Sequence, residues 1–236
     1  MGRIILTLAL AWFAGFLAAD RASAQTSPVV VELFTSQGCN SCPPADELLG
    51  RLADRDDVVA LSLHVDYWDY LGWRDIFGQP AHTQRQRDYA AYLGERMVYT
   101  PQVVVDGREG MVGSHAHKVE AAIKARSGAK AEAAVELRLV GDRVVAAIRP
   151  VSGKAKGQVL MAWFTRAESV EIRAGENRGR RIVYNNVVKG WAELGRYKGD
   201  AVELSAPKPM TADGVAVMVQ SRRDGRIIAA GRLALR

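Results

Sequence analysis

The chain has 236 residues, 48% of them hydrophobic, and a formal net charge of +6 at pH 7. This length allows one large domain or two small ones, and two cysteines are too few for a disulfide-rich scaffold. Because the mild basic charge is not gathered in a run of lysines and arginines, we expect no nucleic-acid partner.

The N-terminus has the features of a secretory signal peptide. Arg3 precedes an uncharged apolar run over residues 4–19, and Ala22-Ser23-Ala24 follows as a small-residue cleavage site. The run is shorter than the roughly 20 residues that a membrane-spanning helix needs. We therefore predict that residues 1–24 are a signal peptide and that the mature chain is periplasmic or secreted, without a membrane span. The alternative is an uncleaved helix that anchors the chain to a membrane.

The two cysteines lie between a predicted strand and a predicted helix. Val29–Thr35 is largely β-branched and apolar on both faces, as is typical of a strand buried on both sides. Prolines and acids at 43–47 favour a first helical turn, and leucines at 48, 49 and 52 continue it at helical spacing. Cys39 and Cys42, three apart, could there close into a disulfide or hold a soft metal.

Strands and helices alternate as far as residue 126. The predicted elements are a strand at Val58–Val65, an aromatic and acidic loop at 66–73, a polar helix at Pro80–Gly94, a hairpin of Gln102–Val105 with Glu109–Gly113, and a helix from Ser114 to Ala125. The order β-α-β-α-β-β-α over residues 28–126 predicts a three-layer sandwich.

The second half changes character after a small-residue connector at 127–131. It contains about seven short strands separated by Gly and Asp turns, which favours a β-sandwich. The predicted strands are Ala133–Val140, Arg143–Pro150, Gln158–Arg166, Arg181–Val188, Ala201–Leu204, Val215–Arg222 and Arg226–Leu235.

The spacing of the thiols favours redox chemistry. A thiol at a helix N-terminus is stabilised as a thiolate by unpaired backbone N–H groups and by the positive helix end, so we expect Cys39 to attack. Cys42, one turn inward, could resolve the resulting mixed disulfide. A purely structural disulfide and a soft-metal site remain as alternatives.

A proline supports the same interpretation. Pro101 directly precedes a predicted strand, a position that is awkward for a central strand unless the Thr100–Pro101 bond is cis. A cis proline facing the cysteines would leave the backbone beside Thr100 free to hold a substrate peptide. An ordinary trans proline at a strand start is the alternative.

Four segments together resemble a known family: CNSCPPAD, HVDYWDYLGW, RQRDYA and YTPQVVVDG. They are similar to proteobacterial secreted proteins classed as domain of unknown function 1223, densely over residues 28–120 and more loosely at 175–177 and 183–191. The resemblance implies a thioredoxin-like domain, with Cys39 as nucleophile, Cys42 as resolving thiol, Pro101 as the cis proline and Thr100 beside it. It implies no established reaction.

We therefore expect an α/β thioredoxin-like N-terminal domain at 27–127 and a C-terminal all-β sandwich-like domain at 131–236. Within the first, Glu32 could move protons from Cys42, or it could be an acid at a strand edge or paired with an arginine. The pair Asn40-Ser41 and the two prolines after Cys42 differ from well-understood thioredoxins, so the redox potential cannot be transferred.

Three further residues are candidates to support the site. His64 and Asp66 end the second strand, at the edge where parallel sheets bind ligands, although a structural histidine is the more common case. Trp68 and its aromatic neighbours could wall a groove for an extended partner or form the core of a capping loop.

A cluster of arginines around 173–181 could be a solvated loop or could contact an acidic partner or the first domain.

The sequence thus predicts a periplasmic thiol–disulfide oxidoreductase that acts on exported proteins or small thiols, with no cofactor and no metal. Two alternatives remain open. One is a binding or assembly module whose disulfide is structural, and the other is a Cu(I) or other soft-metal chaperone that uses the same thiols.

Overall fold

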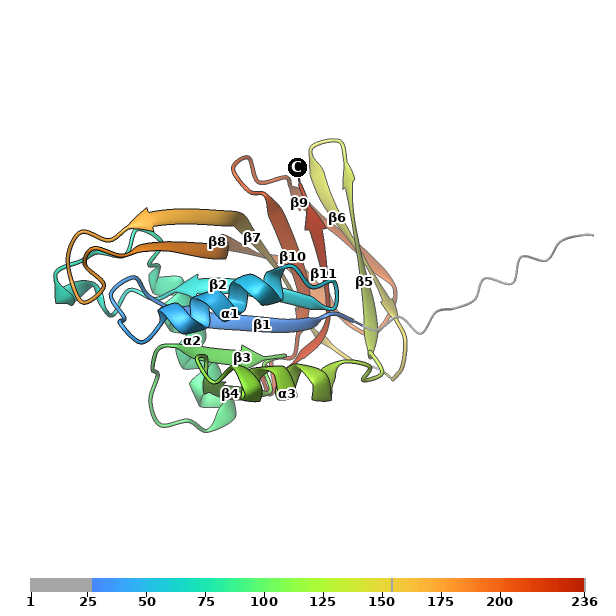
Figure 1. Cartoon of the computed structure of the whole chain (residues 1–236). Coiled ribbons are helices and arrows are strands. Elements are labelled where there is room, and N and C mark those ends of the chain that lie inside the picture. The colour runs from blue at the N-terminus through green and yellow to red at the C-terminus, as the bar shows by residue number, and fades with distance from the viewer. Residues whose placement is uncertain (1–26, 154, 236) are drawn as a thin grey trace, which may run out of the picture.

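We describe the fold from a computed structural model, which covers residues 27–153 and 155–235 (Figure 1). The predicted signal peptide at residues 1–24 lies outside the described residues. In the described part of the chain, no helix is both long enough and apolar enough to cross a membrane.

The first half has the predicted order of elements. Its strands are β1 (Val29–Thr35), β2 (Val58–His64), β3 (Gln102–Val105) and β4 (Glu109–Val112), and its helices are α1 (Pro43–Ala53), the 3-10 helix η1 (Asp69–Leu71), α2 (Pro80–Leu93) and α3 (Ala116–Arg126). β1 pairs in parallel with β2 and antiparallel with β3, and β3 forms the predicted hairpin with β4.

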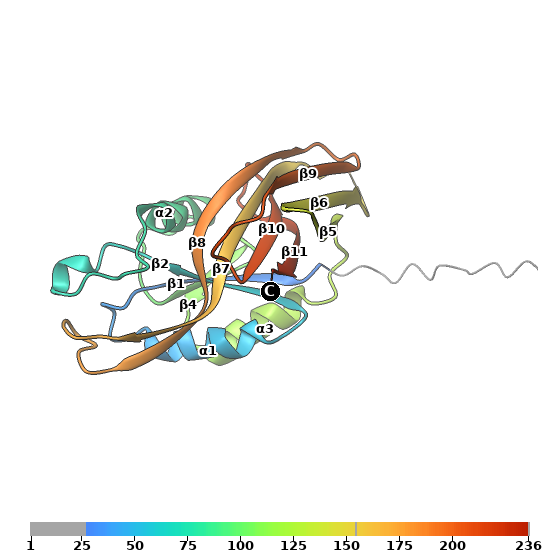
Figure 2. The ribbon, with the colours of Figure 1, turned by 90° about the horizontal axis from the view of Figure 1, so that it is seen from above.

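Helices cover this part of the sheet on both faces. Every residue of β1 and of β2 is buried, as the apolar patterns predict. α1 and α3 lie on one face and α2 on the other (Figure 2). On the first face Leu49 and Ile123 pack with Leu33 of β1, and on the second Tyr89 packs edge-on against Phe34.

The second half contains all of the predicted strands. They are β5 (Ala133–Val140), β6 (Arg143–Pro150), β7 (Gly157–Glu171), β8 (Arg181–Tyr197), β9 (Val202–Pro207), β10 (Gly214–Gln220) and β11 (Ile227–Ala234). β5 and β6 have the predicted bounds. β7 and β8 are much longer than predicted and form one hairpin that projects to the end of the molecule where the loop after β1 also lies (Figure 1).

The assembly of these strands differs from the predicted fold class. One eight-stranded mixed sheet runs in the order β11-β10-β7-β8-β2-β1-β3-β4, and β8 joins β2 with Val187 opposite Ser62. Only β5, β6 and β9 form a separate sheet. An α/β thioredoxin-like domain plus an all-β sandwich-like domain is therefore wrong, because the described chain is mostly β and is built on one large mixed sheet.

The error has a physical cause. β2 is buried along its whole length, so its free edge would expose unpaired backbone groups next to an apolar surface, and such edges are normally covered. β8 covers this edge from more than a hundred residues away, which local sequence patterns do not reveal. The division into residues 27–127 and 131–236 stays a prediction, although the sheet continues across the connector between them.

The core also joins the two halves. One apolar cluster contains Phe34 and Leu63 of the first half together with Val188 and Met218 of the second. A further cluster lies between the three-stranded sheet and the β7, β10 and β11 side of the large sheet. The hairpin of β7 and β8 is thereby held in place from both sides, and this positions its turn beside the cysteines.

Candidate functional site

Cys39 and Cys42 form a disulfide at the start of α1. After β1 the chain turns, with the Cys39 N–H donating to the Ser36 carbonyl at 3.1 Å and the Cys42 N–H to the Cys39 carbonyl at 3.2 Å. Cys42 is the N-cap of α1. Of the two possibilities for this pair, a disulfide or a soft-metal site, the structure shows the disulfide. In residues 27–153 and 155–235, no group of three or more His, Cys, Asp or Glu side chains could hold a metal ion.

The two prolines after Cys42 reduce the number of backbone N–H groups at the helix N-terminus that could donate to a sulfur atom. Pro43 and Pro44 have no N–H, and the next two N–H groups, those of Ala45 and Asp46, both donate to the Cys42 carbonyl. The first turn therefore has no free backbone donor for a thiolate. The Ser41 hydroxyl, 3.4 Å from the Cys39 sulfur, is the polar group that contacts it instead.

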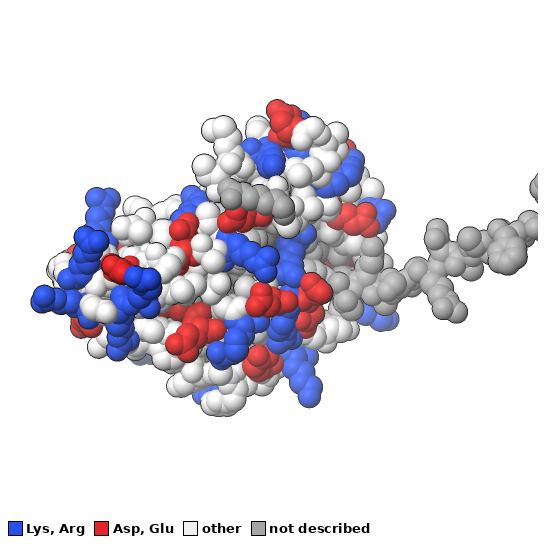
Figure 3. Space-filling model, turned by 45° about the horizontal axis from the view of Figure 1, so that its top comes forward, with Lys and Arg blue, Asp and Glu red and all other residues white. Residues whose placement is uncertain are grey.

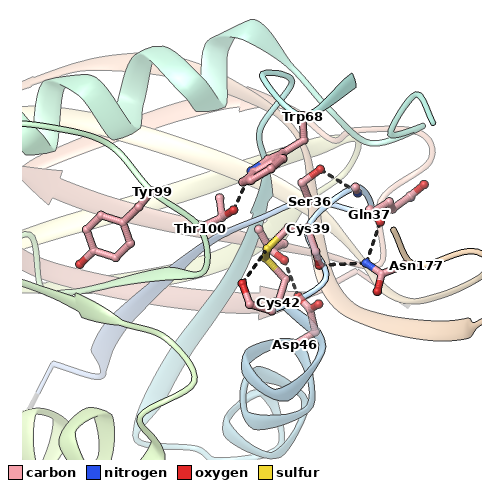
Figure 4. Close-up of a disulfide and its surroundings, with 12 residues drawn as sticks. Ser36, Gln37, Cys39, Cys42, Asp46, Trp68, Tyr99, Thr100 and Asn177 are labelled. Atoms are coloured by element: carbon pink, nitrogen blue, oxygen red, sulfur yellow. Dashed lines mark hydrogen bonds between the residues drawn. A yellow bond between two sulfur atoms is a disulfide. The ribbon is translucent and has the colours of Figure 1, made fainter. Parts of the chain in front are cut away.

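The disulfide is covered. Cys39 is 1% exposed and Cys42 is fully buried, whereas Asn40 and Ser41 between them face solvent. Part of the cover is the segment 66–79, which we call the covering loop. Its Trp68 packs closely against Gly38 and donates its indole N–H to the Thr100 hydroxyl at 2.7 Å (Figure 4).

Thr100 lies beside the cysteines, as predicted from the sequence (Figure 4), and Pro101 follows it directly before β3. The Thr100–Pro101 bond is cis, which confirms that prediction. Pro101 is buried, and its carbonyl accepts the N–H of Gly113 at 2.9 Å. Their predicted contact with a substrate backbone stays a prediction.

The second half contributes a residue that the sequence did not single out. Asn177, in the turn between β7 and β8, donates its side-chain amide to the carbonyls of Gln37 at 2.9 Å and of Cys39 at 2.8 Å. Asn177 approaches the loop from the side opposite Thr100 (Figure 4). Trp73 of the covering loop adds a bond to the Gln37 side chain at 2.8 Å. The loop before Cys39 is therefore held by segments that are distant in sequence.

Glu32 lies in a buried ion pair. Its carboxylate accepts from Arg85 at 2.5 and 3.0 Å and from the Tyr89 hydroxyl. No hydrogen bond in the described chain links Glu32 to either cysteine. The structure therefore favours the alternative in which Glu32 is paired with an arginine.

His64 is held in a structural cluster near the site. Its Nδ1 lies 2.7 Å from Asp75 Oδ2, and its ring packs edge-on against Tyr184 and Phe77. Asp75 Oδ2 also accepts the Gln37 N–H at 2.8 Å, so His64 reaches the loop before Cys39 through Asp75. Burial acts to raise the pKa of Asp75, but His64 together with the backbone N–H groups of Gln37 and Phe77 outweighs burial and lowers that pKa.

Asp66 points away from the cysteines toward α2. Its carboxylate accepts the Thr83 hydroxyl at 2.5 Å, and its N–H donates to the same hydroxyl. Asp66 thus fixes the start of the covering loop on α2. Its predicted part in the chemistry gains no contact from the structure.

Asp46 is a candidate that the sequence analysis passed over. It lies one helical turn after Cys42 and is buried next to it (Figure 4). Oδ1 accepts the Thr35 hydroxyl at 2.8 Å, and Oδ2 is buried with no hydrogen-bond partner. Burial raises the pKa of Asp46 to about 7, against the lowering effect of His64 and Thr35. The i, i+4 spacing from Cys42 was the available signal.

Comparisons with known proteins give a family and a fold. The family model described as protein of unknown function (DUF1223) matches residues 30–220. A crystal structure of a protein from Agrobacterium tumefaciens is 34% identical, covers 89% of this chain and 95% of its own, and has a TM-score of 0.79. HBP35 of Porphyromonas gingivalis is 16% identical, with a TM-score of 0.58 over 89% of this chain and 76% of its own, which shows similarity of fold alone. No curated protein matches the chain.

These findings correct the description of the chain as a thioredoxin-like oxidoreductase. The fold is mostly β, and the 34% identical relative is described without a function. What the structure shows is a buried disulfide at the start of α1.

Proposed function

We propose that this protein, which belongs to the family described as protein of unknown function (DUF1223), exchanges thiols and disulfides through Cys39 and Cys42. The observation that carries the proposal is the placement of a two-residue-spaced disulfide at the N-terminus of α1, beside a buried acid with one unpartnered oxygen. We further propose that the reaction takes place in the periplasm, on exported proteins or small thiols, because a disulfide persists in oxidising compartments.

We propose that the exchange takes place in two steps. In the reduced protein the Cys39 thiolate attacks one sulfur of a partner disulfide, that bond breaks, and a partner thiolate leaves as the mixed disulfide forms. Cys42 then attacks the Cys39 sulfur, the mixed disulfide breaks and the second partner thiolate leaves. Two protein thiols are thereby oxidised and one partner disulfide is reduced. The oxidised protein runs the same steps in reverse.

Asp46 supplies what the second step needs. Cys42 is buried, and a buried thiol must lose its proton before it attacks. The pKa of Asp46 is raised to about 7 by burial, so its carboxyl can take up and return a proton near neutral pH. Its free Oδ2 lies on the turn of α1 that follows Cys42. In this scheme Asp46 takes the role that the sequence analysis gave to Glu32.

The proposal is tested by trapping the intermediate. In Cys42→Ala the second step cannot occur, so mixed disulfides with exported proteins should accumulate on Cys39 and should be released by dithiothreitol. The control is the double variant Cys39→Ala/Cys42→Ala, which should trap nothing. Recovery of no mixed disulfide with an exported protein from Cys42→Ala, together with a Cys39 thiol that does not react with small disulfides in the folded variant, would contradict the proposal.

The burial of both sulfurs favours a second candidate, a binding or assembly module with a structural disulfide. A structural disulfide stabilises the folded state, typically by about 2 to 4 kcal/mol, and is reduced only as the protein unfolds. The two candidates differ in the rate of reduction under native conditions. A rate equal to that of global unfolding favours the structural role, and a much faster rate favours exchange.

A further inference from the structure

Four arginines gather on one turn of the molecule. We call residues 171–181, which join β7 to β8, the hairpin tip. Arg173, Arg178, Arg180 and Arg181 lie in it, and all four are exposed. Figure 3 shows basic side chains gathered at the end of the molecule where Figure 1 places this tip. The hairpin gathers these residues at one projecting end of the structure.

Most of this charge is not neutralised within the protein. Arg181 pairs with Glu171 across the base of the tip. Arg173, Arg178 and Arg180 form no ion pair within the part of the chain that the structure describes, and the same holds for exposed Arg74 of the covering loop. Glu176 is the exposed acid in the turn itself. The tip therefore presents several free guanidinium groups to solvent.

The hairpin tip and the covering loop form one surface beside the disulfide. Gly175 of the tip packs against Trp73, and Asn177 bonds to the Cys39 carbonyl. The covering loop also exposes two large apolar side chains, Tyr70 at 78% and Ile76 at 65%. Arginine next to exposed aromatic and aliphatic side chains is the composition typical of protein-binding surfaces.

We infer that this surface binds an acidic segment of a polypeptide partner whose disulfide or thiols react at Cys39 and Cys42. The inference rests on the proposed function for the reacting groups, but the binding itself is independent of it. Guanidinium groups bind carboxylates in a bidentate manner, and several of them on one turn fit a run of Asp or Glu. A polypeptide is favoured over a small anion because the hollow that the arginines line at the tip is wide open to solvent rather than enclosed, and because Tyr70 and Ile76 add apolar contacts.

Two disulfide-containing peptides test the inference. They are identical except that one has four glutamates and the other four glutamines beside the disulfide. The reduced protein should reduce the glutamate peptide about tenfold faster at low salt, since electrostatic attraction raises association rates by such factors. The ratio of the two rates should approach one as salt shortens the screening length. Equal rates at low salt would overturn the inference.

Matched variants locate the effect. In Arg173→Gln/Arg178→Gln/Arg180→Gln the ratio of the two rates should fall close to one. Because the readout is a ratio measured on one preparation, partial misfolding does not imitate this result. An unchanged ratio in this triple variant would overturn the assignment to the hairpin tip.

The control removes the same charge from the other end of the same hairpin. Lys156, Arg196 and Lys198 are exposed near the open end of β7 and β8, where Gly157 pairs with Tyr197. A strand of this length spans roughly 3.3 Å per residue, so these charges lie far from the tip. Lys156→Gln/Arg196→Gln/Lys198→Gln should keep the full ratio, and its loss would show a general charge effect and overturn the inference.

Failure of the proposed function has a different signature. If neither peptide is reduced, binding of a cysteine-free glutamate peptide is measured by fluorescence anisotropy with the same two triple variants. Binding that depends on the tip arginines then supports the surface while exchange is refuted. Tip-dependent sedimentation with phosphatidylglycerol vesicles, without preference for the glutamate peptide, would overturn the polypeptide partner in favour of a membrane.

Discussion

Two buried polar clusters, both of which join residues of the first half to residues of the second, differ in how completely they are paired. Around Glu32, Arg85 donates to both carboxylate oxygens and to Gln220, and Tyr89 adds another bond. Near the disulfide, by contrast, several buried atoms have no hydrogen-bond partner. They are Gln37 Nε2, Asp46 Oδ2, His64 Nε2, Asn177 Oδ1 and Tyr184 Oη.

This difference changes what each cluster contributes to stability. A buried polar atom without a partner costs roughly 1 to 3 kcal/mol, so such atoms are rare in a stable core. The side chains that bond to Glu32 avoid this cost and tie α2 to β1 and β10, and the unpartnered atom next to them is Nε1 of Trp191, over whose ring Arg85 stacks. The atoms near the disulfide carry this cost. The incomplete pairing of Asp46 is therefore the feature that distinguishes it from Glu32, and it is the reason that we propose Asp46 as the proton carrier.

The largest effect is expected when Glu32 loses its arginine partner. Arg85→Met leaves the Glu32 carboxylate buried without a cation, which should lower the free energy of unfolding by about 3 to 5 kcal/mol in urea denaturation. The control Arg87→Met lies on the exposed side of the same helix and should change it by less than about 0.5 kcal/mol. A loss in Arg85→Met no larger than in the control would mean that the cluster is not structural.

Asp46→Asn tests the unpaired acid through the pH dependence of stability. Burial raises the pKa of Asp46 from 3.8 to about 7, so the folded protein holds this proton more tightly than the unfolded chain does. Stability therefore falls as pH rises from 3.8 to about 7, by on the order of 4 kcal/mol. Asp46→Asn should remove this slope in urea denaturation at several pH values. The exposed neighbour variant Glu47→Gln should keep it, and an unaltered slope in Asp46→Asn would contradict the assignment.

A smaller effect is expected from opening the cover. Trp68→Ala removes the bond to Thr100 and the packing on Gly38, and losing one such bond lowers the cost of opening by about 1.4 kcal/mol. The native disulfide should then be reduced by dithiothreitol about tenfold faster. Tyr70→Ala, which truncates an exposed side chain of the same loop, should leave the rate unchanged. An unchanged rate in Trp68→Ala would show that the indole is not a barrier.

Local sequence patterns were enough for the elements of this fold and for the cysteines. The apolar and β-branched runs located each strand, with β5 and β6 at their observed bounds but with β7 and β8 much too short, and the proline before β3 indicated the cis bond. Their assembly was not predictable in this way. The pairing of β8 with β2 joins Val187 to Ser62, and a periodic pattern states that a strand is buried but not which strand lies beside it.

The same limit explains what the sequence left open at the site. Glu32 is close to Cys39 along the chain, so a proton carrier and a partner of an arginine both remained possible, and the arginine that pairs with it, Arg85, is 53 residues away. Asn177 lies 138 residues from the Cys39 carbonyl that it binds. Asp46 was visible, but it looked like an ordinary acid in a first helical turn, and its burial depends on β2 and β8, which pack around it.

Asn177 has one further consequence, which is mechanical. The same short turn carries the exposed arginines and grips the peptide plane of Cys39. In the hairpin of β7 and β8, the exposed arginines and the residue that bonds to the Cys39 backbone are only a few residues apart. If a partner binds the tip, as we propose, any movement of the tip would reach the Cys39 backbone through the Asn177 amide, and binding would be coupled to the position of the sulfur.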